Sequence, residues 1–307
     1  VAADLSATDA NGGTNGQNLQ VRISNSSGLG GATLQPFASS VPWFVTAGDG
    51  AKTVYVQVVD PAGNASVVAN GTITLAATPP SAGSLVVEDG AAATSKTTVN
   101  AAVSATGAAQ MRFVDNGAVT ADWMPYATTA SVPLGAVTDG STVTVAVAFR
   151  NVARVEGGGA SVNLLVDRTA PTAPAISVNG GAAFTGSTAV TIGASALDAG
   201  AGASGLAKVQ LSNDGFATST TVGYATSLPW TLAAGADGAR TVSARFLDVA
   251  GNVTATVTDG IVLDTTAPAA TTLSLAGNPE APAGFTGPPL VTATPSATDA
   301  NAGAGNA

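Results

Sequence analysis

Short stretches in which apolar and polar residues alternate recur along the whole chain. The clearest examples are rich in Val and Thr: Thr53–Val58, Thr142–Val147 and Thr241–Phe246. An alternation of period two with many β-branched residues predicts strands that turn one face to a core. An Asp-Gly turn signal precedes each of them, at Asp49-Gly50, Asp139-Gly140 and Asp237-Gly238. The pattern therefore predicts an all-β chain with short turns.

These strands belong to a longer unit that repeats. The motif Asp167-Arg-Thr-Ala-Pro171 returns as Asp264-Thr-Thr-Ala-Pro268, and more weakly as Ala76–Pro80. The spacing of these motifs matches the length of one β-sandwich domain. Proline fixes its own backbone angle and extends the residue before it, so the motifs predict stiff linkers. The predicted division is 1–78, a domain lacking its first strand; 79–169, a divergent domain; 170–266, a whole domain; and 267–307, the first strands of a further one.

The hexamer Ser-Ala-Thr-Asp-Ala-Asn occurs at residues 6–11 and again at 296–301. It marks the same place in two repeats, because residue 1 aligns with residue 291. Two interpretations stay open. In the favoured one, the chain is a window on a longer repeat array. In the other, the C-terminal segment of one subunit donates the missing strand to the first domain of the next. Both predict an end-to-end rod, because an incomplete sandwich would expose an open edge and part of its core.

The order of these motifs resembles the bacterial immunoglobulin-like tandem repeat. It runs from an aromatic block with Pro-Trp, through Asp-Gly and Thr-Val-x-Val, to Asp-x-Ala-Gly-Asn and Asp-x-Thr-Ala-Pro. The resemblance covers nearly the whole chain. It implies tandem Ig-like or fibronectin-III-like β-sandwich domains in an extended rod. It also implies an extracellular place at the bacterial cell surface, in giant adhesins, surface layers or fibres. Some similar proteins bind calcium at the junctions between domains.

Composition narrows the chemistry. The chain has no Cys and no His, which excludes disulfides, thiolate catalysis and the usual general base. A net charge of −9 argues against a nucleic-acid partner. No apolar run is long enough for membrane insertion, and no charged-then-apolar leader opens the sequence. Of the 19 acidic residues 16 are Asp, which suits turns and ligation of hard cations.

Calcium is the first candidate ligand, because it is bound by oxygen atoms of loop residues. Acids that recur at three positions near the predicted domain ends are its candidate ligands. They are the acid of the Ser-Ala-Thr-Asp type of motif (Asp9, Asp198 and Asp299), the acid of the Asp-x-Ala-Gly-Asn turn (Asp60 and Asp248) and the acid of the linker motif (Asp167 and Asp264). Loops at one end of a sandwich meet the adjoining linker, so these acids are expected to converge. The simpler alternative is that the acids cap their own turns.

The junction at Ala76 is expected to be the poorest site. The second unit has Arg150–Arg154 in place of the Asp-x-Ala-Gly-Asn turn, so any site there should be absent or replaced.

Three further features have a functional and a structural interpretation. Trp123 and Tyr126 offer a flat surface to a sugar, but packing or a contact between subunits is favoured. Glu88-Asp89 can be seen as half of a glycosidase pair, but a hairpin turn is favoured. Gly157–Gly159 is interpreted as a flexible turn.

The sequence therefore predicts a non-enzymatic structural segment of an extracellular bacterial fibre, surface layer or adhesin stalk. Its partners are expected to be neighbouring repeats or copies of the same chain. One alternative is an adhesive module that binds a host or matrix glycan or protein. The other is a spacer in a secreted polysaccharide-degrading enzyme. No cofactor is required, and calcium is the one candidate ion.

Overall fold

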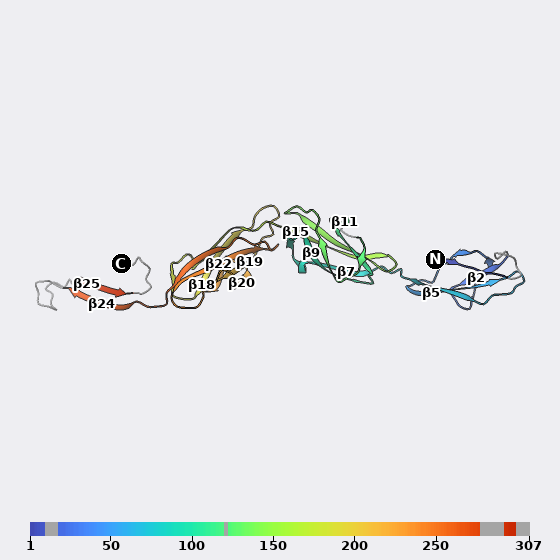
Figure 1. The fold of residues 1–307 in the computed structure, drawn as a ribbon, viewed down its shortest axis with the longest axis horizontal. Coiled ribbons are helices and arrows are strands. Elements are labelled where there is room, and N and C mark those ends of the chain that lie inside the picture. The colour runs from blue at the N-terminus through green and yellow to red at the C-terminus, as the bar shows by residue number, and fades with distance from the viewer. Residues whose placement is uncertain (10–17, 120–121, 277–291, 299–307) are drawn as a thin grey trace. The chain divides into compact units, whose positions relative to one another are not determined.

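The computed structural model describes residues 1–9, 18–119, 122–276 and 292–298. Residues 299–301, the second half of the later copy of the hexamer and its Asp299 among them, lie outside these residues. The described chain is built of strands, and its one helical element is a 3₁₀ turn at Glu88–Gly90. None of its helices is long and apolar enough to cross a bilayer. The prediction of an all-β chain of tandem β-sandwiches is confirmed (Figure 1).

The third sandwich has one sheet of three strands and one of five. The smaller sheet has the order β16-β18-β21 and the larger the order β17-β23-β22-β19-β20. Their bounds are β16 (Thr172–Val178), β17 (Phe184–Thr185), β18 (Ala189–Leu197), β19 (Leu206–Ser212), β20 (Thr220–Gly223), β21 (Ser227–Thr231), β22 (Gly238–Asp248) and β23 (Val257–Leu263). Alternate residues of each strand fill the space between the sheets. Ile192, Val209, Val242 and Phe246 are each fully buried in that core.

The second sandwich has a similar plan. Its three-stranded sheet has the order β13-β9-β7, and the other sheet runs β11-β10-β14-β15-β8 with β12 on β10. The bounds are β7 (Ser81–Val87), β8 (Ala93–Thr94), β9 (Thr98–Thr106), β10 (Gln110–Asp115), β11 (Ala118–Val119), β12 (Met124–Pro125), β13 (Thr129–Pro133), β14 (Thr142–Arg150) and β15 (Glu156–Val166). Short β8 pairs in parallel with the end of β15, as β17 does with β23. All other strand pairs of the third sandwich are antiparallel. In the second sandwich the same holds for the pairs that β9 makes with β7 and β13, and for those that β10 makes with β11, β12 and β14.

The first sandwich is smaller. Strands β3-β2-β5-β6 form one sheet, and β1 and β4 form the other. The bounds are β1 (Ala2–Asp4), β2 (Gln20–Ser24), β3 (Gln35–Pro36), β4 (Ser40–Pro42), β5 (Gly50–Val59) and β6 (Ala69–Leu75). Beyond the third sandwich, β24 (Ala269–Ala276) pairs with β25 (Thr292–Thr298).

Contacts group the chain into two compact units. The first unit comprises 1–90, 98–135 and 144–163, and so holds the first sandwich and most of the second. The second unit comprises 91–97, 136–143 and 164–307. It therefore holds the third sandwich together with the segment that leads into it. This division into two units does not test the boundaries predicted from the sequence, which stay a prediction.

Two local predictions were wrong. Gly157–Gly159 is part of strand β15 and not a flexible turn. A Cβ on Gly157 would lie 2.7 Å from Pro79 Cβ, and one on Gly83 would overlap the Gly158 carbonyl oxygen. The glycines therefore allow strand β15 to approach the linker and β7 closely. Glu88-Asp89 does not turn a hairpin, because β7 pairs with β9 while β8 belongs to the other sheet.

Candidate metal centre

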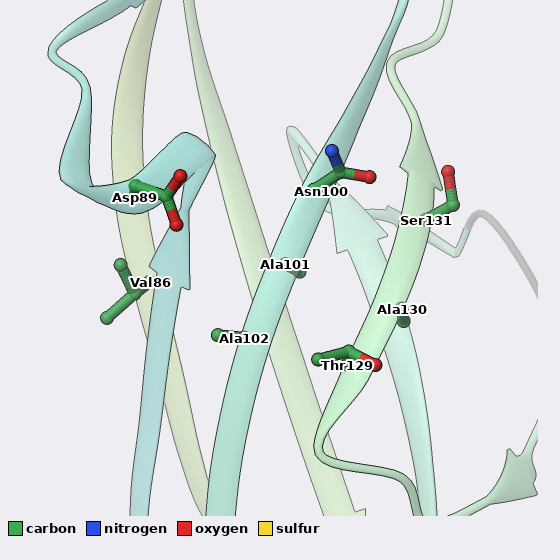
Figure 2. A pocket seen from close by; sticks show the side chains of 8 residues that line it. All are labelled: Val86, Asp89, Asn100, Ala101, Ala102, Thr129, Ala130 and Ser131. Atoms are coloured by element: carbon green, nitrogen blue, oxygen red, sulfur yellow. The ribbon is translucent and has the colours of Figure 1, made fainter.

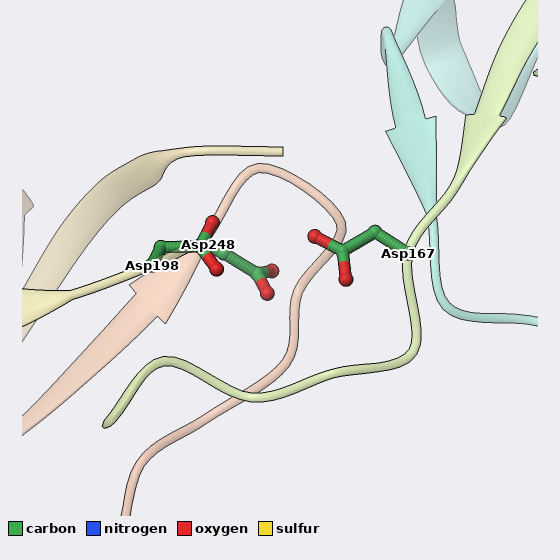
Figure 3. Close-up of side chains that lie close together, drawn as sticks. All are labelled: Asp167, Asp198 and Asp248. Atoms are coloured by element: carbon green, nitrogen blue, oxygen red, sulfur yellow. The ribbon is translucent and has the colours of Figure 1, made fainter. Parts of the chain in front are cut away.

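Three aspartate side chains point toward one another at the entrance to the third sandwich (Figure 3). Asp167 directly follows strand β15, Asp198 directly follows β18, and Asp248 is the last residue of β22. One carboxylate oxygen from each lies within 4.8 Å of the other two. The linker, the loop after β18 and the end of strand β22 therefore each supply one acid.

Backbone and amide donors fix each carboxylate in place. Asn252 donates from its backbone N to Asp248 Oδ1 and from its Nδ2 to Asp248 Oδ2, both at 2.8 Å. Gly205 N donates to Asp198 Oδ2 at 2.6 Å. Thr169 N and Ser204 N donate to the two oxygens of Asp167, at 3.1 and 2.8 Å. These bonds hold the oxygens in position and leave their remaining lone pairs free for a further ligand.

Burial makes this arrangement of negative charge unfavourable by itself. Asp167 and Asp248 are only 2% and 3% exposed, and Asp198 is half-buried. Burial raises the pKa of the Asp248 carboxyl, and the nearby charges of Asp167 and Asp198 raise it further. The bonds from Asn252 act in the opposite direction. Among the described residues, no Lys or Arg forms an ion pair with any of the three. A cation would relieve the repulsion.

The donor set suits a hard cation. Ca²⁺ takes six to eight oxygen ligands at about 2.3–2.6 Å from carboxylates, backbone carbonyls and water. Three carboxylates that come from three segments can supply the charged part of such a shell. Soft metals are poorly matched, because the chain has neither Cys nor His.

Of the seven predicted ligands, the structure brings three together and places three others elsewhere. Asp9 and Asp60 line one hollow of the first sandwich with Asn64, and no third acid lines it. Asp60 caps its own turn, accepting bonds from Asn64 N and Nδ2 at 2.8 and 2.7 Å. Asp264 lies in the following linker and accepts from Thr266 N at 3.2 Å. Its expected partner Asp299 lies outside the described residues.

The joint between a linker and the sandwich that follows it is built differently at the second sandwich, where an amide replaces the turn acid. Asn151 takes the place of Asp60 and Asp248, with the same turn bonds to the residues that follow it. Its buried Nδ2 donates at 2.8 Å to the carbonyls of Ala76 and Thr78 in the preceding linker. In the third sandwich the Asn252 Nδ2 donates to the Asp167 carbonyl at 2.9 Å. The sequence predicts that the acidic site is absent or replaced in this repeat. The group that takes its place is the side-chain amide of Asn151, one residue after Arg150.

The Asp-Gly turns have a second role that was not predicted from the sequence. Asp49 accepts from the backbone of Ala77 and Thr78, and Asp139 accepts from Arg168 N and Thr169 Oγ1. Asp237 likewise accepts from Thr265 and Thr266. Each acid thus holds the linker that follows its own sandwich. The signal was the similar distance in sequence, 28 or 29 residues, between each Asp and the first linker residue that bonds to it.

These three carboxyls should titrate below the usual range. Bonds from the linker hold the pKa of Asp49, Asp139 and Asp237 below 3.8, with the Thr side chains as the first cause in each. A carboxyl with a lowered pKa stabilises the fold above its ordinary pKa, and this stabilisation is lost as the pH falls through the lowered value. NMR titration of the Asp237 carboxyl and the Thr265 amide should give one shared midpoint below 3.8. That amide transition should vanish in Asp237→Asn; a midpoint at 3.8 or higher would contradict the assignment.

Trp123 and Tyr126 lie in internal contacts. The guanidinium carbons of Arg112 and Arg150 lie 4.6 and 4.2 Å from the centroid of the Trp123 ring. Tyr126 packs edge-on against Phe149, and its hydroxyl accepts from Ala105 N at 3.3 Å. Contacts of this kind favour the packing interpretation. The sugar-binding alternative stays a prediction.

A shallow hollow of about 400 Å³ lies on the three-stranded sheet of the second sandwich (Figure 2). It is lined mainly by small side chains of β9 and β13, with Val86 and Asp89 at one side. Glu88 does not join Asp89 there, because its Oε1 accepts from Asn100 N at 2.7 Å. The lining therefore contains one carboxylate, and glycoside hydrolysis needs a pair.

No family model matches the chain, and no curated protein matches it. Among solved structures it is similar to the fibronectin(III)-like modules of Clostridium thermocellum CbhA. The identity is 14% and the TM-score 0.39, over 59% of this chain and 94% of that one. It is also similar to the FN1–FN3 domains of chicken CNTN1, with 12% identity and a TM-score of 0.39, over 80% and 90% of the two chains. The β-sandwich assignment rests on the sheet topology described above.

Proposed function

We propose that this chain is a structural segment of an extracellular bacterial fibre, surface layer or adhesin stalk, and that its joint at Asp167 is fixed by calcium. One observation carries the proposal. The carboxylates of Asp167, Asp198 and Asp248 converge from a linker and from a loop and a strand end of the sandwich that follows it. A cation held there ties the linker to the sandwich.

The hydrogen bonds that side chains make to the linker backbone support a structural role. Side chains bind the backbone of each of the two complete linkers from both directions: Asp49 and Asn151 hold one, Asp139 and Asn252 the other. Flexible tethers between independent domains have no need of such bonds. A chain that keeps its joints ordered is suited to transmit position or load.

The expected affinity fits a place outside the cell. Calcium sites in extracellular modules commonly have Kd values of about 10⁻⁴–10⁻³ M. Three carboxylates supply the charge of such a site, while carbonyl oxygens and water would complete the shell. Magnesium is expected to bind more weakly, because it demands a rigid octahedral shell and loses its water reluctantly.

Calorimetric titration of the full chain with calcium chloride tests the proposal. We expect binding at Asp167 that is lost or weakened at least about tenfold in Asp248→Asn, since one charged ligand is removed. Asp60→Asn is the matched control, because Asp60 has the same turn and the same Asn bonds without two further acids beside it. Equal calcium binding by wild type and Asp248→Asn, or loss of binding in Asp60→Asn alone, would overturn the metal assignment.

A further inference from the structure

A tryptophan at the edge of the third sandwich is held in a fixed orientation. Trp230 lies on β21, an outer strand of the three-stranded sheet, and its indole Nε1 donates to Asn213 Oδ1 at 2.8 Å. The Asn213 Nδ2 donates in turn to the Thr231 carbonyl at 2.9 Å. One amide thus binds both the ring and the strand that carries it, so the plane of the ring is set before any ligand arrives.

The same pair recurs in the first sandwich and is replaced in the second. Trp43 Nε1 donates to Asn25 Oδ1 at 2.8 Å, and Asn25 Nδ2 donates to the Phe44 carbonyl at 3.0 Å. In the second sandwich Asp115 and Val132 take the two positions, as the strand registers show. That sandwich is built on the same plan without the pair. The fold therefore does not require an indole held by an amide.

The Trp230 ring lines a hollow of about 460 Å³ at the side of the third sandwich. Strands β20 and β21, each the outer strand of its sheet, both contribute to it. The half-buried ring also packs against the core, so it is supported from within and accessible from outside. The residues of the lining are all uncharged: Ala189, Val190, Asn213, Thr220, Pro229, Trp230 and Thr231.

We propose that this hollow binds a neutral polysaccharide, with the Trp230 ring stacked against the apolar face of one sugar unit. The inference goes beyond the structural function proposed above, because it gives one sandwich a ligand. It does not depend on the calcium joint.

The chemistry of the lining matches that of a sugar. A sugar ring has an apolar face of C–H groups and a rim of hydroxyls, so its site needs a flat apolar surface with polar groups beside it. Asn213 uses one N–H and one oxygen lone pair in the bonds described above, which leaves one of each for a sugar hydroxyl. Thr220 and Thr231 add two hydroxyl groups. The volume also lies in the range of about 300–1,000 Å³ that is usual for ligand sites.

The absence of charge in the lining selects the class of polymer. Acidic polysaccharides carry carboxylate or sulfate groups, which proteins bind through charge-assisted hydrogen bonds from Arg or Lys. No such side chain lines this hollow. An acidic polymer would therefore lose water from its charged groups without gaining an ionic partner. A neutral polymer makes no such demand.

NMR titration of the full chain tests the site directly. The chain has three Trp, so three indole N–H signals report on three places in one experiment. Cellohexaose, mannohexaose and maltohexaose are added separately, in EDTA so that the calcium site does not contribute. At least one sugar should shift the Trp230 signal to saturation while the Trp123 signal stays in place. No shift at Trp230 with any of the three, or a shift at Trp123 alone, would overturn the proposal.

A matched pair of variants tests the hollow without disturbing the core. Thr220 and Thr221 are both exposed, but they lie opposite Leu211 and Gln210 and so on opposite faces of β20. Only Thr220 lines the hollow. In gels that contain hydroxyethylcellulose, galactomannan or soluble starch, wild type and Thr221→Glu should be retarded alike by at least one polymer.

The Thr220→Glu variant should lose most of that retardation, because it places a charge and a longer side chain in the hollow. Trp230→Ala should lose all of it, and Thr220→Glu keeps the test decisive if Trp230→Ala does not fold. Equal retardation of Thr220→Glu and wild type would show that the polymer binds elsewhere. Retardation of wild type by alginate alone would show an acidic ligand; either result would overturn the proposal.

Discussion

Replacing Asp198 by asparagine is expected to change the stability of the third sandwich in opposite directions with and without calcium. In the calcium-free chain three carboxylates share a largely buried space. An asparagine keeps the acceptor for Gly205 N and removes one of the charges that raise the pKa of Asp248. The variant should therefore be more stable than wild type in EDTA, by about 0.5–1 kcal/mol.

Calcium should reverse that order. At a calcium concentration about 100 times Kd, binding stabilises the folded wild type by about 2.7 kcal/mol. The Asp198→Asn variant should lose most of this stabilisation by calcium, because it lacks one charged ligand. Thermal unfolding followed by calorimetry in EDTA and in calcium should give melting temperatures that cross between the two proteins. Asp9→Asn, at the same position of the first repeat, should show no such crossing. Parallel responses of Asp198→Asn and wild type to calcium would count against an ion at this joint.

Replacing Asn151 by alanine is expected to be strongly destabilising whether or not calcium is present. The Asn151 side chain makes four hydrogen bonds: two to the linker carbonyls of Ala76 and Thr78, and two from the amides of Ala153 and Val155. The residue is only 6% exposed, so water replaces these bonds poorly. Unsatisfied buried groups cost about 1–3 kcal/mol each, and we expect a total of about 2–4 kcal/mol.

Calorimetry and hydrogen exchange can measure this effect. The calorimetric transition of the second sandwich should move to lower temperature, and exchange at residues 76–80 should accelerate. Asn163→Ala is the control, because Asn163 is exposed and bonds only to Thr144 Oγ1 among the described side chains. It should change stability by about 0.5 kcal/mol or less. If Asn151→Ala and Asn163→Ala behave alike, the Asn151 bridge does not hold the linker.

The joint at Asp167 could be predicted because its parts recur in sequence. Asp198 belongs to the Ser-Ala-Thr-Asp type of motif, Asp248 to the Asp-x-Ala-Gly-Asn turn and Asp167 to the linker motif, and each motif returns in another repeat. Convergence then follows from the geometry of a sandwich, in which loops at one end gather near the adjoining linker. The grouping of Asp167 with Asp198 and Asp248 needed no knowledge of side-chain contacts.

The strand register of the second sandwich could not be predicted in this way. The sequence suggests that Thr142 corresponds to Thr53 and Thr241. In the structure Phe149 faces Met111, just as Val58 faces Val21 and Phe246 faces Val209. The alignment must therefore move by two residues. A shift of two keeps the same side chains on the same face, so alternation cannot detect it.

Long-range hydrogen bonds were hidden for a different reason. An Asp-Gly pair predicts a turn whether or not its carboxylate also bonds to a linker. The bonds that Asp49, Asp139 and Asp237 accept from the linkers cannot be predicted from one such pair alone; the sequence hints at them only through the similar distance from each pair to its linker. The contacts of Trp123 with two arginines were equally hidden, because the alignment shows no partner for this residue in other repeats.

The short parallel pairs have a mechanical consequence. Strand β8 lies near the start of its sandwich and pairs with the end of β15, the last strand; β17 and β23 repeat the arrangement. Tension on the chain pulls the two members of each pair in opposite directions along their length. All their hydrogen bonds must then break together in shear, whereas bonds pulled at right angles open one at a time. A stretched chain would thus resist force first at a patch of very few residues, and the sandwich behind it would open only after that patch had failed.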